Sequence, residues 1–546
     1  MESFAPDLRY TPRQPLKPEH IDAIRRVGKE VLFSAGDRVA DVGEPMDRFF
    51  YIEEGRLQLI DPFTHQSYLP DSLGPTQYSG EMALLYGGSH VIPVEAAEPS
   101  RVQVVGREAL LDLIATIPEM GDIIINTFNA RRRRLFEAGD SSLTLIGTEE
   151  DKRLRAISSF ASRSRVAFRD LAIGSEEANA VARACGAEAD KPLVIFGKGQ
   201  VVDDPTPRKI AGLLGMDLDV QDRQVFDVLI VGGGPAGVAA AVYAGAEGLR
   251  AILVDEIAIG GQAGTSSRIE NYMGFPTGIS GADLLWRGQV QAMKFRTQFA
   301  MPRRVQTLTK EDDGLFAARL DDDVVVCARA VIVATGVQYR KLPLDRLEHF
   351  EGAGVYYAAT PAESRFCRDK PVAVIGGGNS AGQAAMFLSE QASHVHVLIR
   401  SGSLAQSMSD YLTSRLEASP TITLHYHTQV SALEGDQYLS GIRLDRANGG
   451  EAEYLDTVGL FVMAGAAPNT DWLSALVKLD EKGFVLTGSA AGSDYQFETS
   501  QPGLFAVGDV RAGSVKRVAS ATGEGSVVIS RVWQHVREAS ETSRTP

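Results

Sequence analysis

Residues 226–256 read FDVLIVGGGPAGVAAAVYAGAEGLRAILVDE and contain the strongest structural pattern in the sequence. Its pattern predicts a buried strand, a glycine turn that opens a helix, and a second buried strand that ends in an acidic residue. Glycines let the backbone approach a pyrophosphate, the helix N-terminus supplies N–H donors, and the acid accepts hydrogen bonds from a ribose. We therefore predict a dinucleotide site, and its residues here are Gly232, Gly234, Pro235, Ala236, Gly237 and Asp255.

A second copy of this pattern, PVAVIGGGNSAGQAAMFLSEQASHVHVLIR, covers residues 371–400. Its second strand ends in Arg400 instead of an acid, and a guanidinium can bind a ribose 2′-phosphate in a bidentate manner. NADP(H) therefore fits this site better than NAD(H), although a merely solvated arginine is the alternative. The predicted nucleotide-binding residues are Gly376, Gly378, Asn379, Ser380, Ala381 (in place of the third glycine) and Arg400.

Composition excludes several classes of protein. With 546 residues the chain is too long for one hydrophobic core, and 70 acidic against 55 basic side chains give a net charge of −15. That balance argues against nucleic acid or an anionic membrane as partner. The basic run at residues 131–134 is interpreted as the solvated face of a helix, with a phosphate backbone as the alternative.

Cysteines and termini add further expectations. Cys185, Cys327 and Cys367 are widely spaced and offer neither a disulfide framework nor a metal-ligand pattern, so no metal site is predicted. The N-terminus lacks the pattern of a secretion signal, and no apolar run reaches membrane-spanning length. We expect a cytoplasmic location.

Several motifs outside the two glycine loops resemble those of thioredoxin reductases. They are GGQAGTSSRIENYMGFP (260–276), VIVATG (331–336), AGAAPNT (464–470) and GLFAVGDV (503–510), and the resemblance spans about residues 226–536. It implies FAD and NADPH as cofactors and a homodimer. It also implies a nucleotide contact at Gly465 and further flavin-side contacts at Gly260, Gly261, Gln262, Asn271, Thr335, Gly336, Gly508, Asp509, Arg517, Val518 and Ala519.

The chain departs from this family at the redox dithiol. Where thioredoxin reductases carry C-A-T-C, this sequence has Ala358-Ala359-Thr360-Pro361, so Ala358 and Pro361 replace both redox cysteines. A thiol must become a thiolate to relay electrons from a flavin, and neither residue can do so. Cys367 is interpreted as structural, the alternative being a redox role in a rearranged loop. Tyr356 and Tyr357 either pack near the flavin ring or are structural.

The first segment resembles a cyclic-nucleotide-binding domain. FSAGD, DRFFYIEEGRLQL and GEMALLYGG match its β-roll and the start of its phosphate cassette, with Gly80 and Glu81 in the ribose-binding positions. His90 stands where that family has the arginine that pairs with the phosphate, and Pro93 replaces a hydroxyl residue. We therefore predict a degenerate pocket, or one for another ligand.

The second segment resembles a thioredoxin fold, with the order strand, helix, strand, helix, strand, strand, helix. Lys191-Pro192 resembles the cis-proline turn of that fold, but residues 148–151 read T-E-E-D where such domains carry C-x-x-C. We therefore expect a scaffold or docking module.

The predicted fold is multidomain α/β. It comprises a β-roll with helices (1–138), a thioredoxin-like domain (139–217), an FAD-binding domain (224–340 and 461–546) and an inserted NADPH-binding domain (341–460). The predicted function is an NADPH-dependent FAD oxidoreductase that passes hydride to flavin N5. Its acceptor is unidentified: a small redox protein, a quinone, an external disulfide or oxygen. The alternative is a non-catalytic flavin- or nucleotide-sensing regulator.

Overall fold

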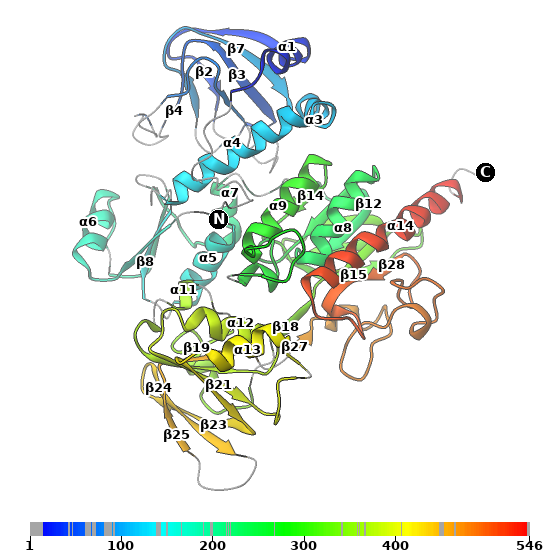
Figure 1. Ribbon diagram of the computed structural model, residues 1–546. Helices are drawn as coiled ribbons and strands as arrows, with labels where there is room; N and C mark the ends of the chain where they lie inside the picture. The colour runs from blue at the N-terminus through cyan, green and yellow to red at the C-terminus, as the bar shows by residue number, and fades with distance from the viewer. Residues whose placement is uncertain are drawn as a thin grey trace.

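The computed structural model describes residues 15–542 apart from positions 42–43, 46, 61–66, 68–71, 81–89, 91–92, 138–142, 149–150, 165, 167, 189, 197–199, 215, 217, 219, 267, 340–341, 358, 360, 365–366, 406, 447–452 and 464–465. Figure 1 shows a β-roll at the top, a small α/β domain below it, and two larger α/β lobes. Long helix α4 leads from the β-roll to the small domain.

The N-terminal lobe consists of two antiparallel sheets with strand orders β1-β7-β3-β5 and β2-β6-β4. Phe50 and Ile52 alternate along β3 and pack with Val102 of β7 in one buried cluster, as a strand period of two requires. The strands are β1 (Lys29–Phe33), β2 (Arg38–Ala40), β3 (Arg48–Glu54), β4 (Leu57–Leu59), β5 (Tyr78–Ser79), β6 (Val94–Ala96) and β7 (Ser100–Gly106). The helices are α1 (Pro18–Val27), α3 (Arg107–Thr116) and α4 (Pro118–Glu137), and the basic run lies in α4, with its side chains outside the described residues.

The small domain has the sheet order β11-β10-β8-β9, in which β8 and β9 are parallel and β10 is antiparallel to both of its neighbours. Its helices begin at Asp151, Ser175 and Thr206, whose side chains accept backbone N–H groups as N-caps. Its elements are β8 (Leu143–Gly147), α5 (Lys152–Arg163), β9 (Arg169–Ala172), α6 (Glu176–Ala184), β10 (Leu193–Phe196), β11 (Gln200–Val201) and α7 (Pro207–Leu213). One expectation is corrected: among the described residues the cis peptide bond precedes Pro302, not Pro192.

The FAD-binding domain is built on the sheet β14-β13-β12-β17-β16-β15, with β28 paired to β17. Strands β12, β13, β14, β17 and β28 run parallel, and their near-continuous apolar sequences reflect burial on both faces. The strands are β12 (Gln224–Val231), β13 (Ala251–Val254), β14 (Gln298–Ala300), β15 (Val305–Lys310), β16 (Phe316–Leu320), β17 (Val325–Val333) and β28 (Leu504–Ala506). The helices and 3-10 turns are α8 (Pro235–Ala246), η1 (Ala263–Thr265), α9 (Gly281–Lys294), η3 (Asp471–Leu473), η4 (Gly488–Ala490), η5 (Gly508–Val510) and α14 (Val518–Thr542).

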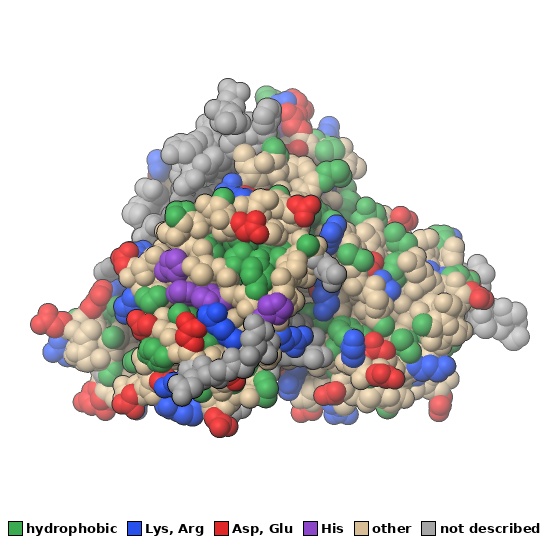
Figure 2. Space-filling view, turned by 60° about the horizontal axis from the view of Figure 1, so that its bottom comes forward, with side chains coloured by type: hydrophobic (Ala, Val, Ile, Leu, Met, Phe, Trp, Pro, Cys, Tyr) green, Lys and Arg blue, Asp and Glu red, His purple; other side chains and the backbone are tan. Residues whose placement is uncertain are grey.

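The NADPH-binding domain has the parallel sheet β19-β26-β20-β21-β22 and a second, antiparallel sheet β23-β24-β25. The strands are β19 (Val355–Tyr356), β20 (Pro371–Ile375), β21 (His394–Ile399), β22 (Ile422–Tyr426), β23 (Thr428–Gly435), β24 (Leu439–Arg446), β25 (Glu453–Asp456) and β26 (Gly459–Val462). The helices are α10 (Leu347–Phe350), α11 (Pro361–Ser364), α12 (Asn379–Leu388) and α13 (Asp410–Ala418). Histidine side chains gather on the face drawn in Figure 2, and β21 and β22 carry three of the chain's histidines.

Two chain crossings join the large domains. Strand β18 (Val337–Tyr339) leaves the FAD-binding domain and pairs antiparallel with the returning β27 (Ala466–Pro468). Because β26 pairs with β20, the NADPH-binding sheet extends to Val462, two residues beyond the boundary expected at 460.

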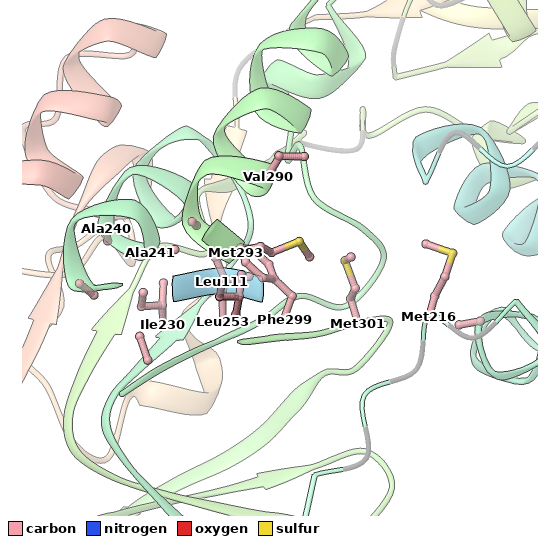
Figure 3. Packing of buried hydrophobic residues seen from close by; sticks show 14 of the residues in the cluster. Leu111, Met216, Ile230, Ala240, Ala241, Leu253, Val290, Met293, Phe299 and Met301 are labelled. Atoms are coloured by element: carbon pink, nitrogen blue, oxygen red, sulfur yellow. The ribbon is translucent and has the colours of Figure 1, made fainter. Parts of the chain in front are cut away.

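The β-roll is docked on the FAD-binding domain. Leu111 of α3 belongs to the same buried cluster as Ile230, Met293 and Phe299 (Figure 3). Arg296, which follows α9, pairs with Asp112 and lies 3.3 Å from Glu108. The predicted multidomain α/β architecture, with an N-terminal β-roll and Rossmann-type domains, is therefore confirmed.

Candidate functional site

A cavity of about 1310 Å³ lies where the FAD-binding and NADPH-binding domains meet. Parallel strands place their carboxyl ends at one edge of a sheet, which brings together the segments that follow β12, β13 and β17. The FAD-binding residues predicted from sequence that line the cavity are Gly232, Gly234, Pro235, Ala236, Asp255, Gly261, Gln262, Asn271, Thr335, Gly336, Gly508, Asp509, Arg517, Val518 and Ala519.

The first glycine loop has room for a diphosphate. Gly232 has φ +109°, and a Cβ there would lie 2.4 Å from the Ala334 carbonyl oxygen. Gly234 caps α8, and a Cβ at that position would meet no atom within 4 Å, so the helix N-terminus opens onto free space. Gly237 and Gly260 do not line the cavity. Gly237 instead allows α8 to pack on the turn, since its Cβ would lie 1.9 Å from the Gly232 oxygen.

Asp255 anchors this loop. Its Oδ2 accepts the Gly233 N–H at 2.7 Å, and its Oδ1 accepts those of Ile257 and Ala258 at 2.9 and 3.0 Å. Burial raises the pKa of Asp255, while these N–H groups and the charge of Arg163 act in the opposite direction. A carboxylate has about four acceptor positions, so capacity remains for a ribose hydroxyl.

Residues next to the first glycine loop and α8 also fit a polar cofactor. The Thr335 hydroxyl oxygen is buried and has no hydrogen-bond partner among the described residues. Burial raises the pKa of Asp509, and the turn that carries it is held by Glu524, which accepts the Gly508 N–H at 2.7 Å. Together with the glycine loop and Asp255, these residues fit the FAD that the sequence motifs imply.

The second glycine loop shares the cavity. Asn379 and Ser380, at the N-terminus of α12, line it. Gly376, with φ +143°, is required by close packing, because a Cβ there would lie 2.7 Å from the Met463 oxygen. Gly378 caps α12, the buried Ala381 packs behind it, and neither lines the cavity. Arg400 is exposed after β21 and does not line the cavity either, and Gly465 lies outside the described residues.

The segment that lacks the dithiol faces the same cavity. Tyr356, Tyr357 and Ala359 line it, Pro361 begins α11, and Ala358 lies outside the described residues. The Tyr356 ring packs on Phe461 with a centroid distance of 5.2 Å. The tyrosines therefore face the cavity and are also fixed by packing within their own domain.

Cys367 lies apart from the cavity. It is 1% exposed, and burial raises its pKa to about 11. Its sulfur is packed against Gly459, where an added Cβ would lie 2.9 Å away. All three cysteines are free thiols. Since a nucleophilic thiol must ionise, this environment supports the structural interpretation of Cys367.

The β-roll carries the residues at which the sequence resemblance places a nucleotide site. Gly80 has φ +91°, and a Cβ there would lie 2.2 Å from the Arg48 oxygen, so packing alone explains this glycine. His90 is buried, and its Nε2 has no hydrogen-bond partner among the described residues. Burial, with a smaller contribution from the charge of Arg48, lowers the pKa of His90. Glu81 lies outside the described residues.

Two cavity residues come from an unexpected source. Arg155 and Arg163 belong to α5 of the thioredoxin-like domain, yet both line the cavity beside the flavin-side residues. The apolar spacing of Leu154, Ile157 and Phe160 indicates which face of α5 is buried, and it leaves these arginines on another face. No sequence motif identifies them as cofactor contacts.

These features define a class of protein: an oxidoreductase with two dinucleotide-binding domains, one for FAD and one for a nicotinamide nucleotide. The chain belongs to the pyridine nucleotide-disulphide oxidoreductase family, whose model matches residues 226–525. Residues 30–117 match the model of the cyclic nucleotide-binding domain. The expected oxidoreductase class, its FAD and NADPH cofactors and the N-terminal domain resemblance are thereby confirmed.

Individual relatives agree with this family assignment. NADPH-dependent thioredoxin reductase 3 of Arabidopsis thaliana is 34% identical over 308 residues, which is 55% of this chain and 56% of that protein. NADH dehydrogenase of Bacillus subtilis (strain 168) is 31% identical over 334 residues, which is 61% of this chain and 62% of that protein. The chain thus covers less than two thirds of the length of these two relatives.

Solved structures and shorter relatives each match a little over half of the chain. Thioredoxin reductase of Mycolicibacterium smegmatis is 34% identical over 303 residues, 56% of this chain and 94% of that protein. The structure of T. acidophilum thioredoxin reductase matches with TM-score 0.53 and 29% identity, over 57% of this chain and 99% of that one. Within the described part of the chain, no helix has the length and apolar character needed to cross a membrane.

Proposed function

We propose that the chain is an NADPH-dependent FAD oxidoreductase that delivers electrons to an external acceptor without an internal redox disulfide. One observation carries this proposal: flavin-side residues such as Asp509 and the nicotinamide-loop residues Asn379 and Ser380 line one continuous cavity. Two reactants held in one cavity gain the rate advantage of proximity and orientation. When bound, FAD supplies a two-electron carrier that takes hydride from a nicotinamide.

The chain's residues have distinct tasks in this function. The Gly232–Gly237 turn and the α8 N-terminus hold the diphosphate, and Asp255 holds both the glycine loop and a ribose. Tyr356 and Ala359 are buried and line the cavity on the side of the NADPH-binding domain. The N-terminus of α12 presents N–H groups to the nucleotide, as the first loop does on the flavin side.

Electrons must leave by a route other than the family's dithiol. Ala358 and Pro361 carry no sulfur, and Cys367 is a buried, un-ionised thiol away from the cavity. The acceptor is a small redox protein, a quinone, an external disulfide or oxygen.

Arg400 is proposed to select NADPH over NADH. It is exposed at the end of β21, where the equivalent β13 ends in the acidic Asp255. A guanidinium there offers charge-assisted hydrogen bonds to a 2′-phosphate, whereas a carboxylate would repel it.

A second candidate function is regulation without catalysis. The observation that favours it is the docking of the β-roll on the FAD-binding domain, through Leu111 and the pairing of Arg296 with Asp112. Such packing would couple ligand binding in one domain to the arrangement of the other.

Stopped-flow mixing with NADPH separates the two functions. The purified protein should be yellow with one FAD per chain, and NADPH should bleach the flavin band rapidly under anaerobic conditions. Re-oxidation by ferricyanide, menadione or oxygen then ranks the acceptors. A flavin-loaded protein whose band persists for minutes with excess NADPH would refute the oxidoreductase proposal and support the regulator.

A further inference from the structure

Helix α5 of the thioredoxin-like domain lies against the cofactor cavity. Its buried face carries Leu154, Ile157 and Phe160, which pack in the core, and its N-cap Asp151 accepts the N–H groups of Arg153 and Leu154. The helix is therefore well defined at its start and along its inner face.

One end of the cavity-facing side of α5 is fixed to the NADPH-binding domain. Arg155 Nη1 donates to the Glu351 carbonyl oxygen at 2.8 Å. Gly352 has φ +80°, and an added Cβ would lie 2.0 Å from the same nitrogen, so a side chain there would displace the guanidinium from this position. The Glu351 carboxylate in turn accepts the Tyr357 hydroxyl at 2.8 Å.

The other end of this side carries Arg163, which lines the same cavity as the first dinucleotide motif. Arg163 lines the cavity beside Asp255 and is eight residues from Arg155, about 12 Å along the helix axis at 1.5 Å per residue. Among the described residues the structure gives Arg163 no hydrogen bond or ion pair shorter than 4 Å. The neighbouring cavity arginines differ, since Arg303 is 3.4 Å from Asp322 and Arg304 is 3.9 Å from Glu256.

The charge balance calls for a cation at this position. The turn from Gly232 to Gly237 holds no basic side chain, and Asp255 and Glu256 add negative charge beside it. A dinucleotide diphosphate brings two further negative charges. Arg163 is exposed, lines the same cavity as Asp255, and its positive charge acts to lower the pKa of that carboxyl.

We propose that the thioredoxin-like domain completes the FAD site, with Arg163 as a binding residue for the adenosine diphosphate half of the cofactor. This proposal rests on FAD being the cofactor of the proposed function. Arg155 is a positioning residue, because it ties the same helix to the segment that carries Tyr356 and Tyr357. FAD binding and docking of this domain are then thermodynamically linked.

The test measures FAD and ADP binding in the full-length protein. Arg163→Ala should raise the FAD dissociation constant about tenfold, the loss of one charge-assisted contact at a partly solvated site, and Arg163→Lys should raise it less. Dissociation is followed by the fluorescence of released FAD. ADP, which carries only the adenosine half, should compete with FAD for apoprotein about tenfold less well in Arg163→Ala.

Arg153→Ala is the matched control. Arg153 lies on the same helix, is 66% exposed, and lies 3.6 Å from Asp204 in a separate cavity. It should bind FAD and ADP as the wild type does. If Arg163→Ala fails to fold, the FAD and ADP affinities of Arg163→Lys still test the proposal, because lysine retains the charge but lacks the planar guanidinium fork.

Unchanged FAD and ADP affinities in a folded Arg163→Ala protein would overturn the proposal. An equal loss in Arg153→Ala would also overturn it, because general destabilisation of the domain would then explain the effect. Failure of the proposed function would give a different result, in which the protein binds FAD tightly but NADPH does not reduce the bound flavin.

Discussion

The backbone N–H of Gly233 donates a 2.7 Å hydrogen bond to Oδ2 of Asp255, so the acid that follows β13 holds the glycine loop that follows β12. The same carboxylate holds the start of the next loop through Ile257 and Ala258. Asp255 is therefore part of the loop's construction as well as a predicted ribose acceptor. This double role makes its replacement more disruptive than the loss of one ligand contact.

Asp255→Ala should weaken FAD binding by about 1–3 kcal/mol, because it removes the ribose acceptor and leaves buried N–H groups unpaired. The thermal midpoint of the apoprotein should also fall. Flavin fluorescence titration and calorimetry measure the two effects. Asp227→Ala is the control, because Asp227 accepts the Arg250 N–H at 2.9 Å in the same sheet and does not line the cavity. Equal FAD affinity in both variants would contradict this role.

Arg400→Ala should reduce the preference for NADPH over NADH. We expect KM for NADPH to rise about 5- to 30-fold with little change for NADH, since the 2′-phosphate loses its charge-assisted contacts. The preference in the wild type should be modest, because the ten residues that follow Arg400, SGSLAQSMSD, include no second basic side chain. Arg446→Ala, on β24, is the control. Identical nucleotide ratios in wild type and Arg400→Ala would show that Arg400 does not bind the phosphate.

Cys367→Ser should leave NADPH-dependent flavin reduction unchanged. Burial raises the pKa of Cys367 to about 11, so at pH 7 only about one thiol in ten thousand is ionised. Iodoacetamide should label the less buried Cys185 well before Cys367 in the native protein. Reduction of dithionitrobenzoate should be weak, and strong activity that disappears in Cys367→Ser would establish a redox role instead.

Cyclic AMP should bind the β-roll poorly at neutral pH. Burial and Arg48 lower the pKa of His90 below its usual value near 6.5, so the imidazole is neutral where a cyclic phosphate would need a cation. Calorimetry should show no micromolar binding, and His90→Arg with Pro93→Thr should restore some. Because the pKa of His90 is lower in the folded protein than in the unfolded chain, the unfolded chain takes up the proton first as the pH falls. The stability of the native state should therefore decrease below about pH 6.5. Micromolar binding by the wild type at pH 7.5 would contradict this prediction.

The two dinucleotide loops could be predicted because their chemistry is local in sequence. Gly232, Gly234 and Asp255 lie within one strand-turn-helix-strand unit, where spacing alone specifies geometry. The thioredoxin-like order of strands was predictable for the same reason, since each turn and N-cap, such as Asp151, is a local signal.

The rest of the site depends on packing between domains. Arg155 and Arg163 reach the cavity only because α5 lies against both larger domains, and no periodicity or motif encodes that contact. The end of the NADPH-binding domain was predicted at residue 460, two residues short of the end of β26. An apolar strand such as β26 can be assigned to its sheet only when its partner, β20, is known. Likewise, Gly80 matches a ligand-binding position, yet its conformation is explained by the nearby Arg48 backbone.

The paired crossings β18 and β27 bear on how such a chain can be assembled. Tyr339 lies opposite Ala466 in their antiparallel ladder, so the chain enters and leaves the nucleotide-binding domain at one point. Every strand of the flavin-side sheet lies outside the inserted segment. Replacing the segment between these two strands would exchange the whole nicotinamide-binding domain, with its specificity, and leave the flavin-side sheet intact.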